Sequence, residues 1–142
     1  MNTIFKLRNF LFSFGRIVDK ALAKELSITL PQFAILTAIS HKPSGTQAVF
    51  AEMRKISPAA VSKQIDLLLK NKLITRKNSK KDRREHSILI TPKGKIILKK
   101  SMDIFERHQE KVFKHVSKNS RKQFNQILDT LLTHIDKSSV CK

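Results

Sequence analysis

Apolar residues recur at steps of three and four along most of this chain, which predicts a mainly α-helical protein. Near the start, Ile4, Leu7, Leu11 and Phe14 form one stripe, and further phenylalanines widen it to more than half of the helix circumference. A terminal helix with so much apolar surface rarely finds enough partners inside a small monomer. We expect a second subunit to cover the extra face, with an ordinary core helix as the alternative.

Capping sequences mark where five further helices begin. The segment TLPQ at 29–32 has the spacing of a capping box with proline in the first turn, and proline also follows the capping residue of the fourth and fifth helices. The five predicted capping residues are Thr29, Thr46, Ser57, Thr91 and Ser120. The fifth helix is the longest, at roughly 25 residues or on the order of 37 Å. About six helices in all are therefore expected.

The short third and fourth helices have one apolar face each. The third should hold Val49, Phe50 and Met53 inward, and the fourth should bury Val61, Ile65 and Leu68, which follow one another at i, i+4 and i+7. The opposite face of the fourth helix carries small and polar residues, among them Ala59, Ser62 and Lys63. Such a face fits a groove roughly 12 Å wide, although an ordinary solvated face is the alternative.

A basic β-hairpin follows these two helices. Residues 73–77 and 86–90 are short strand candidates, joined by a polar loop without glycine. Within that loop Lys80, Lys81, Arg83 and Arg84 surround Asp82. The order of helix, helix and basic hairpin is typical of a protein that reads nucleic acid.

The charge of the chain points to the same kind of partner. Its 142 residues suit one domain, and 29 Lys and Arg against 11 Asp and Glu give a formal net charge of +18. Residues 54–100 hold 15 of the basic residues and three acids, which leaves +12 in a third of the chain. Apolar residues are still 40% of the total, which argues against a disordered basic tail. A folded body that attracts polyanions is expected.

Other classes of site find little support in the sequence. The single cysteine, Cys141, allows no intrachain disulfide and no cysteine-based metal cage, so a reducing cytoplasm is the simplest compartment. Charged residues interrupt each apolar run, so neither a signal peptide nor a membrane span is expected. His41, His108 and His115 with Glu106 are too scattered to predict a metal site. No nucleophile–base pair or glycine-rich phosphate loop suggests an enzyme or a cofactor.

Four segments in this order resemble the MarR (multiple antibiotic resistance regulator) family of winged helix-turn-helix transcription factors, over nearly the whole chain. They are residues 28–32, 46–52, 56–74 and 82–94. The last is the most specific, because Asp82, Arg84, Thr91 and Gly94 occupy the places of the family's wing motif. Arg54 and Lys55 depart from the family, which usually has an apolar residue and glycine there. Lys55 in a left-handed conformation would carry a backbone cost that glycine avoids.

The resemblance implies a homodimeric regulator, most simply a repressor, that binds an inverted-repeat operator in double-stranded DNA. Residues 30–91 would form the DNA-binding lobe, and residues 1–29 and 92–142 the dimerisation region of a single domain. A small effector in a cleft between these regions is also expected. The alternative from another class is a non-specific nucleic-acid packaging or RNA-binding protein, which the high charge also suits.

The resemblance also assigns residues to these roles. The recognition helix would read the major groove through Ser57, Ala59, Ser62, Lys63 and Gln64. The wing would contribute Lys77, Lys80, Lys81, Asp82, Arg83 and Arg84, with Arg84 in the minor groove and Asp82 orienting it. The dimer interface would include Ile4, Leu7, Leu11, Phe124, Leu128, Leu131 and Ile135. The apolar lining of the effector cleft would be Phe10, Phe14, Phe33 and Met102, which suit a plain core equally well.

Overall fold

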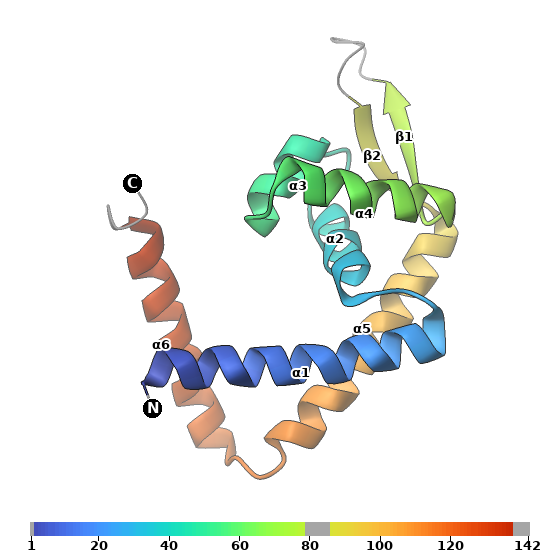
Figure 1. Ribbon diagram of the computed structural model, residues 1–142. Helices are drawn as coiled ribbons and strands as arrows, with labels where there is room; N and C mark the ends of the chain where they lie inside the picture. Colours follow the sequence, from blue (N-terminus) through green and yellow to red (C-terminus); the bar gives the residue numbers. More distant parts are fainter. Residues whose placement is uncertain (1, 79–85, 138–142) are drawn as a thin grey trace. The chain divides into compact units, whose positions relative to one another are not determined.

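The computed structural model describes residues 2–78 and 86–137, which form six helices and one two-stranded antiparallel sheet (Figure 1). The elements in chain order are α1 (Thr3–Leu26), α2 (Leu30–His41), α3 (Gln47–Arg54), α4 (Pro58–Lys70), β1 (Ile74–Asn78), β2 (His86–Ile90), α5 (Pro92–Phe113) and α6 (Lys118–Lys137). The predicted class, mainly α with a small β-hairpin, is confirmed. The chain divides into two compact units, one ending at Glu106 and the other beginning at Arg107.

Side-chain caps start the helices of the first unit much as predicted. Thr29 and Gln32 form a reciprocal capping box, with Thr29 Oγ1 accepting from Gln32 N at 3.2 Å and Gln32 Oε1 accepting from Thr29 N at 2.8 Å. Thr46 caps α3 by accepting from Val49 N at 3.4 Å, and Ser57 caps α4 by accepting from Ala60 N at 3.1 Å. These local hydrogen bonds explain why the helices begin where they do.

The core of the first unit lies around α2, with α3, α4 and the hairpin packed near it (Figure 1). Val61, Ile65 and Leu68 on α4 and Phe50 on α3 are all fully buried, as predicted. Met53 differs from its prediction, since 43% of it is exposed. The helix α3 has only eight residues, and Met53 is the last but one of them.

The hairpin is anchored to the helices at its base. Ile74 pairs with Ile90 and Asn78 with His86, and the buried Ile88 also donates its backbone N–H to the carbonyl of Gly45 at 2.9 Å. The first strand lies one residue later than predicted. The loop residues 79–85, including the predicted wing residues Lys80, Lys81, Asp82, Arg83 and Arg84, lie outside the described residues.

The first turn of α5 is joined tightly to the turn that follows α4. Thr91 Oγ1 accepts from Gly94 N at 2.9 Å and donates to the carbonyl of Lys72 at 2.8 Å, while Thr91 N donates to the carbonyl of Leu73 at 3.0 Å. Lys93 Nζ adds a contact of 3.2 Å to the carbonyl of Asn71. The start of α5 is therefore fixed to the end of α4 through backbone groups.

In the second unit, α6 begins one turn earlier than predicted. Ser120 was expected to cap it, but Ser117 Oγ accepts from Ser120 N at 3.1 Å and the helix starts at Lys118. The side chain of Arg121, in the first turn of α6, donates to the carbonyls of Phe113 and Val116, the latter at 3.1 Å, and to Glu110 at 3.2 Å. The α5 end is satisfied by a side chain of α6.

Candidate nucleic-acid interface

The outward face of α4 carries most of the predicted recognition residues. Ser57, Ala59 and Lys63 are exposed and Ser62 is half-buried, so their side chains are available to a partner. Gln64 is different, because it is half-buried and its Oε1 is shut off from solvent with no hydrogen-bond partner among the described residues. The geometry therefore suits the first four residues better than Gln64.

The turn between α3 and α4 forms despite the unusual residue at its centre. Lys55 has φ 51° and ψ 44°, the left-handed conformation that the sequence suggested, and its N–H caps α3 by donating to the carbonyls of Ala51 and Glu52. A non-glycine residue in this region costs roughly 1–2 kcal/mol. Arg54 and Lys55 are both exposed, and they add two positive charges beside the start of α4.

Arg76 connects the hairpin to both short helices, which the sequence reasoning missed. Its Nη2 donates to Gln47 Oε1 on α3 at 3.1 Å and lies 3.7 Å from Asp66 Oδ1 on α4. The arginine side chain is 36% exposed and the Asp66 side chain 67%, so solvent screens the ion pair. The contact therefore adds little to the stability of the fold, and its main effect is to orient the hairpin strand β1 against α3 and α4. Lys77, the described member of the predicted wing residues, is exposed beside it.

The helix starts add to the positive field of these side chains. None of the six described helices has an acidic residue in its first turn. At α2 a carboxylate from another helix meets the positive end of the helix dipole, since Asp19 Oδ1 accepts from Leu30 N at 2.7 Å. No residue in the first turn of α4 offsets the positive end of its own dipole in this way. At α4 this end coincides with the exposed Ser57, a geometry in which backbone N–H groups can meet phosphate.

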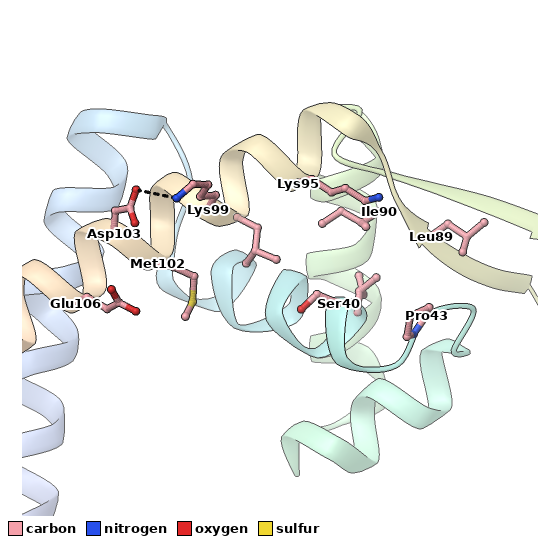
Figure 2. Close-up of a pocket in the computed structure, with 11 residues that line it drawn as sticks. Ser40, Pro43, Leu89, Ile90, Lys95, Lys99, Met102, Asp103 and Glu106 are labelled. Atoms are coloured by element: carbon pink, nitrogen blue, oxygen red, sulfur yellow. Dashed lines mark ion pairs between the residues drawn. The ribbon is translucent and has the colours of Figure 1, made fainter.

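A cavity of about 780 Å³ lies between the end of α2, strand β2 and α5 (Figure 2). Ile39, Leu89 and Met102 contribute apolar lining, and on α5 the lining residue Lys99 pairs with Asp103, four residues further on, at 3.9 Å. Of the four residues predicted for an effector cleft, only Met102 lines it. The volume is within the range of roughly 300–1,000 Å³ common for small-molecule sites.

The three phenylalanines predicted for that cleft pack along the first unit instead. Phe14 meets Phe105 edge to face with centroids 5.3 Å apart, Phe33 lies 6.0 Å from Phe105, and Phe10 stacks on Phe14 at 6.1 Å. Phe33 is buried, at 6% exposure. The sequence did not show that Phe105 contacts Phe14 and Phe33. Its place in the apolar stripe of the fifth helix was the only indication that it is packed inside.

Most of the residues predicted for a dimer interface are exposed, so each of the two units carries apolar surface. On α1, Ile4 is 64% exposed and Leu11 57%, while Leu7 is half-buried. On α6, Phe124, Leu131 and Ile135 are exposed and Leu128 is half-buried. These large side chains are costly to leave in water.

Among the residues that the structure describes, no group of three His, Cys, Asp or Glu side chains could hold a metal ion. No single helix in this part of the chain is both long and apolar enough to cross a membrane; α1 and α2 pass such a test only as a pair, which is bent by 85°.

Comparisons with known proteins agree with this geometry. The sequence model of the MarR family matches residues 28–86. A MarR transcriptional regulator from Methanosarcina mazei Go1 is 22% identical, with a TM-score of 0.85 over 94% of this chain and 96% of that one. The S. aureus MepR–DNA complex is 20% identical, with a TM-score of 0.82 over 95% and 98%. A Mycobacterium tuberculosis MarR family protein in complex with salicylic acid is 21% identical, with a TM-score of 0.75 over 92% and 96%.

No curated protein is significantly similar to the chain in sequence. At the identities above, the solved structures establish the fold, and the family match supplies the sequence pattern of the helix-turn-helix and the start of the wing. Residues 28–86 therefore carry the sequence pattern of the MarR family, and the chain shares the fold of solved MarR proteins.

Proposed function

We propose that this protein is a homodimeric transcription regulator that represses its targets by binding an inverted-repeat operator in double-stranded DNA. The observation that carries the proposal is the exposed, acid-free N-terminal face of α4, with Ser57, Ala59 and Lys63, next to a basic hairpin. The solved relative bound to DNA supports it, because this chain shares its fold. Such a role implies a cytoplasmic location, where the DNA is.

Contacts to phosphates and contacts to bases have different roles in the proposed complex. Lysines and arginines on and near the wing supply affinity through phosphates, and the few side chains at the start of α4 supply the choice of sequence. Arg84 reaches into the minor groove and Asp82 orients it. If each protomer neutralises several phosphates, the logarithm of the binding constant should fall linearly with the logarithm of the salt concentration. Each neutralised phosphate should add roughly 0.9 to the steepness of that fall.

Selection of bound DNA from a random pool, at two salt concentrations, tests this proposal directly. We expect an inverted repeat with half-sites roughly one helical turn, about 34 Å, apart. A pool that stays random, with binding lost to competitor DNA at moderate salt, would instead support the non-specific packaging alternative. That alternative draws on one observation, the net charge of +18.

Substitution of Lys63 separates base reading from charge. Lys63→Ala should change the preferred base at one position of each half-site, whereas Lys100→Ala on α5 removes the same charge from an exposed site and should alter affinity alone. An equal loss of affinity for all sequences with Lys63→Ala would make Lys63 a phosphate contact.

The dimer requires the apolar faces of the terminal helices. We assign residues 1–29 and 92–142 to dimerisation and residues 30–91 to DNA binding. Leu131→Asp places a charge on an apolar, exposed face of α6 and should abolish both the dimer and operator binding. Asn125→Asp introduces the same charge at another exposed position of α6 and should leave both intact. A folded Leu131→Asp monomer with full operator affinity would refute the dimer.

The cavity between α2, β2 and α5 is our candidate for the effector site. The M. tuberculosis relative was solved with salicylic acid, so salicylate is the first ligand to try by NMR titration. Shifts should saturate and centre on residues such as Leu98 and Met102, and Met102→Trp should fill the cavity and remove them. Saturable shifts that survive in Met102→Trp would place the effector elsewhere.

A further inference from the structure

Helices α3 and α4 end in the same kind of turn, and each turn contains a lysine in the left-handed conformation. Lys55, directly after α3, has φ 51°, and Lys72, two residues after the end of α4, has φ 59°. In each turn the lysine donates its N–H three residues back, and the next residue donates its N–H five residues back. The four hydrogen bonds are Lys55 N to Glu52 O at 3.1 Å, Ile56 N to Ala51 O at 3.1 Å, Lys72 N to Leu69 O at 3.0 Å and Leu73 N to Leu68 O at 3.0 Å. Both helices are thus closed by a lysine in a position that favours glycine.

Lysine strains the backbone at both positions. A Cβ crowds the neighbouring carbonyl oxygen when φ is positive, whereas glycine has no Cβ and adopts this conformation freely. Lys55 and Lys72 are both exposed, so burial in the core does not offset the strain. What lysine adds to each turn, and glycine would not, is a positive charge on a flexible stem.

The two lysines differ in their distance from the face proposed to meet DNA. Lys55 precedes Ser57 by two residues, so at most about 7 Å of extended chain separates them. Lys72 follows a helix of 13 residues, so roughly 20 Å of helix lies between it and Ser57. The carbonyl of Lys72 also accepts from Thr91 Oγ1 at 2.8 Å, where the turn is joined to α5. Of the two lysines, only Lys55 therefore lies beside the start of α4.

We propose that Lys55 is a DNA-contact residue, whose ammonium binds a backbone phosphate next to the bases that α4 reads. Its charge would strengthen DNA binding at the expense of the more stable turn that glycine would give. A phosphate contact carries no information about sequence, so Lys55 would raise affinity without changing base preference. This inference rests on the DNA binding in the proposed function and adds to it a contact outside the wing and α4.

Lys55→Gly and Lys72→Gly form a matched pair, because each removes one charge and one strained residue from the same kind of turn. Affinity is measured over a range of salt concentrations, on the operator obtained by selection and on an unrelated duplex. Lys55→Gly should weaken binding to both duplexes by roughly tenfold, and the salt dependence should become shallower by roughly 0.9 per protomer. Lys72→Gly should change affinity by no more than about twofold, because salt screens a charge that far from the DNA.

Urea unfolding separates a lost contact from a lost fold. Both glycine variants should unfold at a higher urea midpoint than the wild type, because the left-handed strain is removed. Lys55→Arg keeps the charge in the same turn and should retain the affinity. If Lys55→Gly does not fold, Lys55→Asn removes the charge with a residue that tolerates positive φ, and it should show the same loss of affinity.

Three results would overturn the role of Lys55. These are unchanged affinity in Lys55→Gly, equal losses of affinity in Lys55→Gly and Lys72→Gly, or a loss of affinity without a shallower salt dependence. A selection that yields no operator would instead reject sequence-specific regulation as the proposed function. The comparison of the two variants on the unrelated duplex would then still decide whether Lys55 contacts DNA.

Discussion

Gly94 is the residue at which a single added methyl group should do most damage to the fold. A Cβ there would lie 2.0 Å from the carbonyl oxygen of Leu73 and 2.7 Å from Ile90 Cγ1. The oxygen cannot easily retreat, because it accepts the backbone N–H of Thr91 at 3.0 Å. No described glycine has a positive φ, so the close approach of two backbones, and not a left-handed conformation, is what requires glycine here.

The size of the effect of Gly94→Ala follows from three contributions. Forcing an extra methyl group into a packed site costs roughly 1–3 kcal/mol, and weakening the hydrogen bonds around Thr91 costs about 1 kcal/mol more. Alanine recovers at most about 1 kcal/mol through its higher helix propensity. We expect Gly94→Ala to lower the free energy of unfolding by about 1–4 kcal/mol.

Gly15→Ala is the matched control for Gly94→Ala. A Cβ at Gly15, in the middle of α1, would meet only Leu30 Cδ2 at 3.4 Å, an ordinary contact, so this variant should gain up to about 1 kcal/mol. Urea unfolding measures the stability of both variants at one protein concentration, because the stability of the proposed dimer would depend on that concentration. A Gly94→Ala variant as stable as Gly15→Ala would refute the close approach.

Three further substitutions test other parts of the structure. Lys55→Gly should stabilise the protein by about 0.5–1 kcal/mol in urea unfolding, because glycine removes the left-handed strain; a loss of stability would argue against that conformation. Thr91→Val removes both hydrogen bonds of its hydroxyl and should cost about 1–3 kcal/mol, while Thr130→Val on α6 should be nearly neutral. Arg121→Ala frees the carbonyls at the end of α5, so amide hydrogen exchange at residues 116–121 should accelerate; unchanged exchange would exclude that role.

The sequence predicted the elements well where the causes are local. The capping box at Thr29 and the cap at Ser57 involve residues three positions apart, so their spacing in the chain is also their spacing in space. The same holds for the buried row of Val61, Ile65 and Leu68 on α4. The prediction from sequence failed at the start of α6, because Ser117 and Ser120 both suit a capping position. The structure uses Ser117, and Arg121 donates to the carbonyl of Val116 just before it.

The candidate site divides in the same way. The exposed residues at the start of α4 could be read from the helical repeat, whereas the role of Arg76 depends on the hairpin lying against α3 and α4. The residues predicted for one cleft lie in two places. Phe14 and Phe33 pack against Phe105, whereas Met102 lines the cavity between α2, β2 and α5.

By itself, the amino-acid sequence determined the order of helices and hairpin, the caps of α2, α3 and α4, the buried row of α4 and the concentration of charge, because each depends on residues close together in the chain. Only the tertiary structure decided which side chains meet across elements: Gly94 against Leu73, Phe105 against two phenylalanines, and Arg76 against Gln47 and Asp66. Such contacts depend on how helices pack to remove apolar surface from water. Spacing along the chain does not specify that packing.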